Sequence, residues 1–286
     1  MKINSKKIHY PILAGLVFTS YMAGLRLSVM TWNVWGHPGT HLMPQRLSSI
    51  NSLIKTTYPD IILLQEINAE IIASILHAFG EVYSHVPPGD DVAWSNESNI
   101  LWRTDLFTPI EYGKFPLDIP DFPDRALFWV KLASTCTTES FPPIMFSTAH
   151  MPWVGCNAEI TTGVNVRIEI TQKICKFFSQ IKGIKHIPLI FTGDFNEDFH
   201  PLRVLREEMG MIDVFESLDL PSPVTHPVRP CDVCEEIRPD RTLDWITHLL
   251  PVGCRVIAAY VKSVRGGYPP PSDHMPVVAV FELFCK

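Results

Sequence analysis

The segment Gly193-Asp194-Phe195-Asn196 follows a run of apolar residues over 187–191. A short apolar run of this kind, ended by glycine and polar residues, predicts a buried β-strand. Because residues i and i+2 of a strand point to the same face, we expect Asp194 and Asn196 to project together from its end. A carboxylate and a carboxamide placed in this way can hold a hard cation or orient a water molecule beside it. The end of this strand is therefore a candidate site of chemistry.

The apolar pattern of the whole chain predicts an α/β protein. Strands are predicted at 25–34, 60–64, 100–102, 127–132, 144–148, 187–191, 211–215, 243–247, 256–261 and 276–283. Helices are predicted at 45–55, 69–79 and 168–181, where apolar residues recur at helical spacing. Strands and helices alternate early while strands dominate late, which favours mixed sheets. Four proline clusters, at 109–123, 142–152, 221–239 and 269–276, are expected to be loops.

The N-terminus resembles a targeting segment. Lys2, Lys6 and Lys7 precede an uncharged, largely apolar stretch over 8–25. A positive region before an apolar one is typical of a signal peptide or an uncleaved anchor, so residues 1–24 are expected to direct export. The protein would then be secreted, periplasmic or membrane-anchored, with membrane association through residues 8–25. A buried N-terminal strand is the alternative, and it would leave the protein in the cytoplasm. No linker interrupts residues 25–286, which are expected to form one catalytic domain.

The charge and the cysteine content exclude few functions. The formal net charge of -6 comes without a basic stripe, so the chain lacks the electrostatic footprint of a tight nonspecific duplex-binding protein. Cys231 and Cys234 are spaced for a local disulfide in an oxidising compartment. A zinc site that adds His226 and Cys254 to this pair is the alternative. Asn96-Glu97-Ser98 is a glycosylation sequon if the source cell glycosylates.

Four polar segments lie where apolar strands begin or end. In chain order they are Thr31-Trp32-Asn33-Val34-Trp35-Gly36, Leu63-Leu64-Gln65-Glu66, Gly193-Asp194-Phe195-Asn196 and Ser272-Asp273-His274-Met275-Pro276. Each supplies a hard oxygen ligand or a group that carries a proton. Strand ends hold such groups rigidly, which a metal-dependent site requires.

These segments resemble those of the endonuclease/exonuclease/phosphatase superfamily, over about residues 27–281. Two further segments add to the resemblance: Ser147-Thr148-Ala149-His150, and Arg241-Thr242-Leu243-Asp244-Trp245-Ile246. The resemblance implies a four-layer sandwich of two mixed β-sheets flanked by helices. It also implies a divalent-metal-dependent hydrolase of phosphate esters that requires Mg²⁺ or Mn²⁺.

The resemblance also implies roles for individual residues. The expected metal ligands are Asn33, Glu66 and Asp273, and Glu66 is the strongest of them because it is a lone carboxylate after a wholly apolar strand. The expected catalytic residues are His150, Asp194, Asn196, Asp244 and His274. Asp194 and Asn196 would activate and position water, while Asp244 would orient His274 for acid–base catalysis. Arg125 and Arg167 are expected to contact the substrate phosphate.

The substrate is less constrained than the reaction. Nucleic acid, phospholipid (as in a sphingomyelinase) and inositol phosphate all remain open, and a catalytically silent binding module on the same fold is the alternative to an enzyme. Specificity is expected from the loops at 87–98, 113–125, 151–166 and 221–241. Trp35, Trp94, Phe122, Trp153 and Tyr268 are candidates for stacking on bases or contacting lipid. We expect the protein to act as a monomer.

Overall fold

The computed structural model describes residues 24–36, 43–135, 141–227, 240–264 and 270–284. The targeting segment expected at 1–24 lies outside this range apart from Gly24, as do the Cys231–Cys234 pair and Tyr268. The three cysteines within it, Cys156, Cys175 and Cys254, are free thiols. Among the described residues, no helix has the length and apolarity needed to cross a bilayer.

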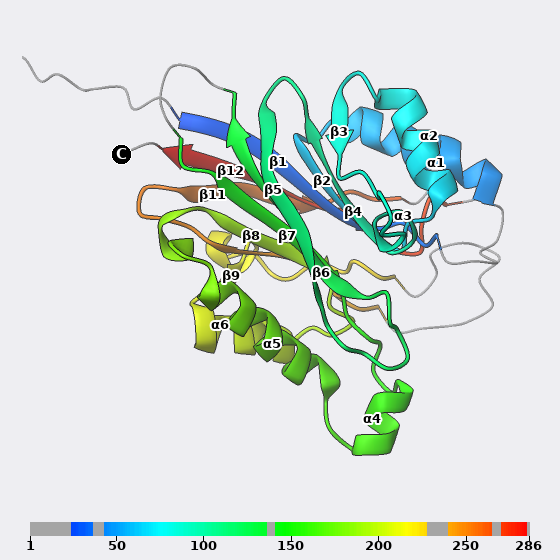
Figure 1. Ribbon diagram of the computed structural model, residues 1–286, viewed down its shortest axis with the longest axis vertical. Helices are drawn as coiled ribbons and strands as arrows, with labels where there is room; N and C mark the ends of the chain where they lie inside the picture. The colour runs from blue at the N-terminus through cyan, green and yellow to red at the C-terminus, as the bar shows by residue number, and fades with distance from the viewer. Residues whose placement is uncertain (1–23, 37–42, 136–140, 228–239, 265–269, 285–286) are drawn as a thin grey trace, which may run out of the picture.

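Two six-stranded mixed sheets form the centre of the protein (Figure 1). The first has the strand order β11-β12-β1-β2-β4-β3 and the second β5-β6-β7-β8-β10-β9. The strands of the first sheet are β1 (Gly24–Asn33), β2 (Ile61–Gln65), β3 (Tyr83–His85), β4 (Ser98–Arg103), β11 (Arg255–Val261) and β12 (Val277–Phe284). Those of the second are β5 (Phe107–Pro116), β6 (Ala126–Ser134), β7 (Ile144–His150), β8 (Leu189–Asp194), β9 (Ile212–Asp213) and β10 (Asp244–Leu249).

Helices cover the outer face of each sheet. Helices α1 (Met43–Thr57) and α2 (Ala69–Phe79) lie on the first sheet, while α5 (Val166–Gln180) and α6 (His200–Met209) lie on the second. Short helices α3 (Ala93–Asn96) and α4 (Asn157–Thr162) and 3₁₀ turns η1 (Ile184–His186) and η2 (Glu216–Leu218) occupy connections. The expected four-layer sandwich is confirmed.

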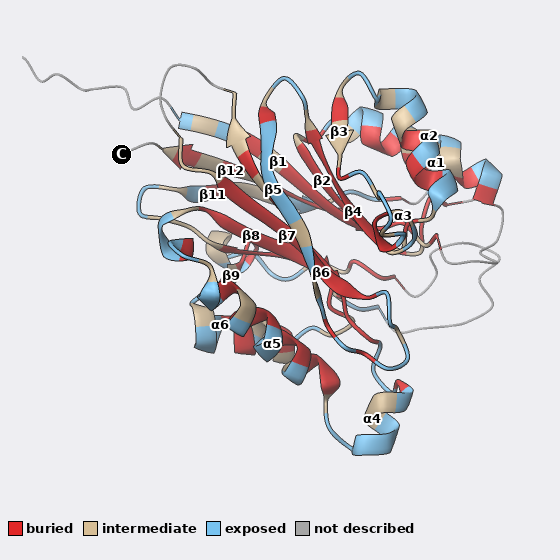
Figure 2. Ribbon diagram, viewed as in Figure 1, coloured by how far each residue is buried: buried red, intermediate tan, exposed pale blue. Residues whose placement is uncertain are grey.

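The alternating strand residues explain this layering. One face of each sheet packs against the other sheet, in a core that includes Leu27, Ile61, Phe128, Phe146 and Phe281. The opposite faces pack against the helices, which is why Met30 and Ile62 meet α1 and α2, and Met145 and Phe191 meet α5 and α6. Burying both faces makes these strands apolar throughout, and Figure 2 shows the buried strands at the centre of the molecule.

The predicted strands and long helices match the observed ones within a few residues, apart from the four elements β3, β5, β9 and α6. Residues 109–116 were expected to be loop because of their prolines, but they form most of β5. Within the described residues this strand pairs only with β6, so it is an edge strand that tolerates proline. Most of its residues are exposed and carry no apolar signal. Strand β3 and helix α6 were not predicted, whereas the strand predicted at 211–215 is reduced to the two residues of β9.

Parallel pairing gathers the polar strand ends at one edge of the sandwich. Strand β1 runs parallel to β2, and β7 runs parallel to β8. Asn33 and Gln65 are therefore neighbours at the carboxyl ends of one pair, as are His150 and Asp194 at the ends of the other. Asp244, at the start of antiparallel β10, is also in register with Asp194. Carboxyl ends of parallel strands are a common place for ligand sites in α/β folds.

Candidate active site

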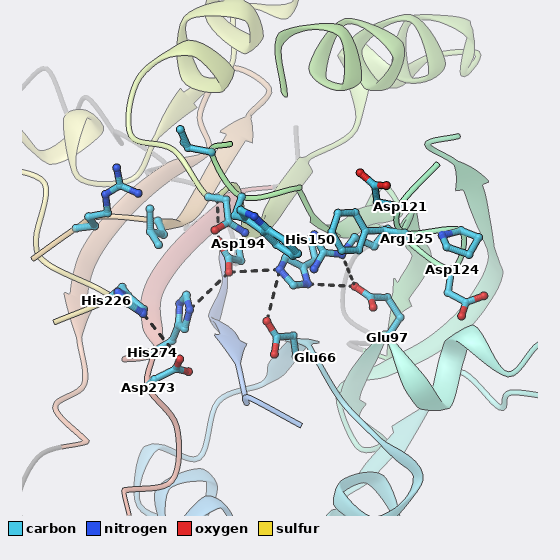
Figure 3. A pocket seen from close by; sticks show the side chains of 17 residues that line it. Glu66, Glu97, Asp121, Asp124, Arg125, His150, Asp194, His226, Asp273 and His274 are labelled. Carbon is cyan, nitrogen blue, oxygen red and sulfur yellow. Dashed lines mark hydrogen bonds and ion pairs between the residues drawn. The ribbon is translucent and has the colours of Figure 1, made fainter. Parts of the chain in front are cut away.

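The strand ends surround a pocket of about 780 Å³ (Figure 3). Seven of the predicted site residues line it: Glu66, Arg125, His150, Asp194, Asn196, Asp273 and His274. Asn33 and Asp244 lie immediately behind this lining and bond to it. Arg167 is the one predicted site residue that the structure does not bring to the pocket.

Asn33 joins the carboxylates of the two sheets. Its Nδ2 donates to Glu66 Oε1 at 2.9 Å and to Asp194 Oδ2 at 3.0 Å, while its Oδ1 accepts from the Trp35 backbone N–H. Asn33 is 1% exposed and Asp194 2% exposed, so this contact is protected from solvent. The two ends of the Asn33 carboxamide have nearly the same shape, so a 180° turn would place Oδ1 where Nδ2 now lies, between the two carboxylates. In that orientation Asn33 would offer an oxygen ligand to a cation.

The local backbone around the site is unusual. Trp35, Glu66 and Asn196 all have φ close to +50°, a left-handed conformation that is uncommon for residues other than glycine. Such conformations concentrate at functional sites, where the surrounding structure holds them. The predicted strand alternation is therefore not what aligns Asn196 with Asp194. Instead, Asp194 Oδ1 accepts the Asn196 N–H at 2.9 Å in a turn just beyond β8.

Gly193 is required by the close approach of β8 to β7. A Cβ atom at this position would lie 1.9 Å from the carbonyl oxygen of Ala149. Only glycine allows the two backbones to come this close while φ is +146°. Gly193 therefore brings the ends of β7 and β8, with His150 and Asp194, into one site.

His274 is held by a buried carboxylate. Its Nδ1 lies 2.8 Å from Oδ2 of Asp244, which has no exposed surface, and its Nε2 lies 3.7 Å from Oδ2 of Asp194. Burial alone would lower the pKa of His274, but the charges of Asp244 and Asp194 and the hydrogen bond to Asp244 outweigh it. The pKa is therefore raised well above its ordinary value, which favours the protonated imidazole.

His150 contacts carboxylates on both sides of its ring. Its Nδ1 lies 3.1 Å from Glu97 Oε1, and its Nε2 lies 3.6 Å from both Glu66 Oε1 and Asp194 Oδ2. His150 at the end of β7 and His274 in the turn before β12 thus approach the same oxygen of Asp194, as Figure 3 shows. Glu97 was considered in the sequence only as part of a sequon, because a single carboxylate between α3 and β4 gives no motif.

Arg125 lies at the pocket as predicted. Its side chain is 8% exposed, donates from Nη1 to the Met151 carbonyl at 2.9 Å and lies 3.6 Å from Glu97. The Met151 carbonyl also accepts from Asn196 Nδ2 at 2.8 Å. The guanidinium packs over the ring of Phe122, 4.0 Å from its centroid, and Phe122 contacts Trp153 edge-on. Arg125 and these two rings form one wall of the pocket.

Arg167 occupies a different position from the one expected. Its guanidinium is 2% exposed and is bonded to Glu197 at 2.7 Å, to Glu159 at 2.5 Å and to the Pro152 carbonyl at 3.1 Å. Glu197 follows the Asp194 segment, Pro152 follows β7, and Glu159 lies on α4 in the connection between β7 and α5. Arg167 therefore connects two segments next to the site. Its guanidinium bonds to these protein groups and does not line the substrate pocket.

Asp273 lies apart from the other expected metal ligands. It is grouped with His226 and His274, whereas Glu66 is grouped with His150 and Asp194. Burial would raise the pKa of Asp273, but the imidazole of His226, 3.8 Å away, and the nearby charge of His274 hold it below its ordinary value. His226 was expected to bind metal only together with cysteines. Within the described residues, Cys254 does not lie in any cluster of possible metal ligands.

The group around Glu66 suits a hard divalent cation. One ligand atom each from Glu66, His150 and Asp194 lies within 4.8 Å of the others, and the Asn33 amide bridges the two carboxylates. Mg²⁺ and Mn²⁺ prefer a few oxygen ligands of this kind and retain several waters. Two like charges that share one amide are also better stabilised by a cation than by that amide alone.

Similar folds occur in several solved structures. A TDP2 structure from D. rerio, complexed with a single-strand DNA product, has a TM-score of 0.72 at 17% identity, covering 90% of this chain and 98% of that chain. A Bacteroides thetaiotaomicron endonuclease/exonuclease/phosphatase family protein has a TM-score of 0.71 at 21% identity, covering 92% and 100%. A mannosyl-6-phosphatase of the same species has a TM-score of 0.65 at 22% identity, covering 90% and 100%. At these identities the likeness concerns the fold.

The sequence comparisons decide the family. No curated protein matches the chain significantly. The profile of the Endonuclease/Exonuclease/phosphatase family, however, matches residues 30–274, which include every residue of the pocket described above. The chain belongs to the endonuclease/exonuclease/phosphatase family.

Proposed function

We propose that this protein is a divalent-metal-dependent phosphodiesterase. The observation that carries the proposal is the convergence on Asp194 of two histidines from distant segments, the end of β7 and the turn before β12. His150 and His274 lie 3.6 and 3.7 Å from Asp194 Oδ2, and each is held from behind by a carboxylate, Glu97 or Asp244. A structural histidine needs only one satisfied contact, whereas this arrangement orients two proton carriers toward one point.

Glu66, Asp194 and the Asn33 carboxamide would hold Mg²⁺ or Mn²⁺. A bound divalent ion would polarise the phosphate and stabilise the departing oxygen. Asp273 would contribute from the neighbouring group. The charge of the pocket supports a bound cation. Several carboxylates line the pocket, and Arg125 and Arg241 are its lining guanidinium groups. A divalent ion would reduce the repulsion between these carboxylates and an anionic phosphate.

The protein side chains would carry the proton transfers. Asp194 accepts the proton of the attacking water, and Asn196, fixed by the Met151 carbonyl, keeps that water or the substrate in line. The His274 imidazolium, oriented by Asp244, donates to the phosphate oxygens or the leaving group. His150 stabilises the negative charge that develops on the phosphate. Positioning and charge neutralisation are the main requirements of phosphoryl transfer.

The presence of the whole set of residues favours an enzyme over a silent binding module. The TDP2 neighbour holds a DNA product and another neighbour is a mannosyl-6-phosphatase, which supports phosphate esters as the substrate class. Sphingomyelin and inositol phosphates remain alternatives within it. We also propose that residues 1–24 direct export, which fractionation of cells that express the full chain and a chain lacking 1–24 would test.

The test is hydrolysis of bis(p-nitrophenyl) phosphate by the purified protein. We expect activity with Mg²⁺ or Mn²⁺, loss with excess chelator and at least a hundredfold loss in Glu66→Gln. Glu70→Gln, an exposed glutamate on α2, is the matched control and should keep full activity. Full turnover in excess chelator would reject the proposal. A panel of plasmid DNA, single-stranded DNA, RNA, sphingomyelin, inositol polyphosphates and a 5′-tyrosyl oligonucleotide then identifies the substrate.

A further inference from the structure

The pocket contains a second group of ligand atoms beside the Glu66–Asp194 group. One atom each from His226, Asp273 and His274 lies within 4.8 Å of the other two. Two imidazoles and one carboxylate are a donor set suited to Zn²⁺ and other first-row transition metals, whereas Mg²⁺ prefers oxygen ligands alone. We propose that these three residues form a transition-metal site that adjoins the hard-cation site and shares Asp273 with it, and that an ion bound there blocks proton transfer by His274.

The site is held by the backbone on both sides. The His226 and Arg241 backbones exchange hydrogen bonds in both directions at 2.9 Å, and the Met275 N–H donates to the Thr225 carbonyl at 2.7 Å. Ser272 Oγ accepts the His274 N–H and donates to the Asn33 carbonyl. These bonds fix His226 beside the Asp273–His274 segment, although the two are distant in sequence.

An ion that binds Nε2 of His274 displaces the proton from this nitrogen, since only a neutral imidazole is a metal ligand. Asp244 accepts from Nδ1 of His274, which leaves Nε2 directed into the pocket. A carboxylate behind a histidine in this way is the usual support of a metal-binding imidazole, since it fixes the tautomer and raises the basicity of the ligand nitrogen. His226 Nε2 lies 3.8 Å from Asp273 Oδ2, and its buried Nδ1 has no hydrogen-bond partner among the described residues.

The side chains need only small movements to bind an ion. The two rings pack edge-on with their centroids 4.7 Å apart, and both are almost fully buried. Tetrahedral coordination with Zn–N bonds of about 2.0–2.1 Å brings the ligand atoms to about 3.3 Å from one another. Three protein ligands leave a fourth position, which opens into the pocket, for water or a phosphate oxygen.

The functional consequence rests on the proposed function. An ion on Nε2 of His274 occupies the nitrogen that would otherwise transfer the proton. Zinc would therefore inhibit the enzyme even when Mg²⁺ saturates the group around Glu66, and a zinc-selective chelator would restore activity. The binding site itself does not depend on whether the protein is a phosphodiesterase.

The experiment measures binding rather than turnover. The full chain is titrated with Zn²⁺ by calorimetry and with Co²⁺ by visible absorption, both in saturating Mg²⁺. We expect one equivalent to bind, with the d–d bands of cobalt in a nitrogen and oxygen environment. His226→Asn should weaken binding at least tenfold. Glu66→Gln should keep it, and His77→Asn, which alters an exposed histidine on α2, should also keep it.

Several outcomes would overturn the proposal. Wild-type protein that binds no Zn²⁺, or His226→Asn protein that binds it normally, excludes this site. Binding that is lost in a Cys231→Ser, Cys234→Ser double variant would assign the ion to thiolates instead. Circular dichroism, and a second variant, His226→Gln, check that the loss of zinc binding in His226→Asn is not due to unfolding. Zinc binding without any phosphodiesterase activity would reject the proposed function and leave the metal site standing.

Discussion

Glu97 Oε1 lies 3.1 Å from Nδ1 of His150, and this contact joins the two sheets at the pocket. Glu97 ends α3, just before β4 of the first sheet, whereas His150 ends β7 of the second. The contact fixes which nitrogen of the imidazole faces Glu66 and Asp194. The geometry thus gives Glu97 a positioning role that its sequence context does not reveal.

Replacement of Glu97 should reduce turnover more than substrate binding. We expect Glu97→Gln to lower kcat for bis(p-nitrophenyl) phosphate about tenfold or more, because the amide no longer holds the correct imidazole tautomer. KM should change less. Glu111→Gln, an exposed glutamate on β5, is the control. A large rise in KM at constant kcat would instead indicate that Glu97 contacts the substrate.

Loss of His274 or of its buried partner should nearly abolish turnover. We expect His274→Ala and Asp194→Ala each to lower kcat at least a hundredfold, on the scale of lost acid–base catalysis. Asp244→Asn should have a comparable effect, because an amide cannot stabilise the imidazolium. Asp219→Asn, on the surface, serves as the control. Near-normal hydrolysis by folded variants, as judged by circular dichroism, would refute these assignments.

Much of the fold could be predicted because burial on both faces leaves a continuous apolar signal. Strands β2 and β8 are of this kind, and the predicted boundaries lie within two or three residues of the observed ones. Edge strand β5 has no such signal, since exposed residues and Pro109 break the pattern. Helix α2 was predicted at its observed ends because apolar residues recur at regular spacing, and the structure adds that Asn68 caps it.

The site was predictable only where its residues end strands. Asn33, Glu66, Asp194 and His274 follow or precede apolar runs, which is why they were visible. His226 reaches the pocket from a connection without periodicity. The partner of Arg167 could not be predicted from the sequence, because an arginine on an amphipathic helix can face solvent, a phosphate or carboxylates. The fold places Glu159 and Glu197 beside it.

Trp153 is expected to favour phosphodiesters that carry a planar group on the ester that is not cleaved. It is 50% exposed at the pocket rim and contacts Phe122, which in turn packs on Arg125. We expect Trp153→Ala to lower kcat/KM about tenfold for bis(p-nitrophenyl) phosphate, on the scale of one stacking contact. Methyl p-nitrophenyl phosphate, which has the same leaving group, should be little affected.

Two further variants make the Trp153 test specific. Trp153→Phe should keep most of the preference for bis(p-nitrophenyl) phosphate, because a smaller ring still stacks. Ile160→Ala removes an apolar side chain that is 74% exposed on α4 and should change neither substrate. If Trp153→Ala slows both substrates equally, the indole supports the loop and does not select the substrate.

Arg167 should contribute to stability and not directly to phosphate binding. Arg167→Met leaves the carboxylates of Glu159 and Glu197 without their buried partner, at a cost of about 3–5 kcal/mol in the free energy of unfolding. Urea denaturation measures this loss. Arg203→Met, on the exposed side of α6, should cost less than about 1 kcal/mol. Unchanged stability with a raised KM would restore the phosphate-contact role.

His248 should make the protein less stable as the pH falls below neutrality. Burial lowers the pKa of this imidazole to about 4, whereas the unfolded chain titrates near 6.5. Between these values the unfolded state takes up a proton that the folded state refuses, so stability present above pH 6.5 is lost on acidification. The loss should be about 2 kcal/mol between pH 7.5 and pH 5.

His248→Asn removes the titrating group, and its stability, measured by urea denaturation, should fall less steeply over this range. His77→Asn, which changes an exposed histidine, should follow the wild-type profile. Parallel profiles for wild type and His248→Asn would show that this imidazole does not control acid stability.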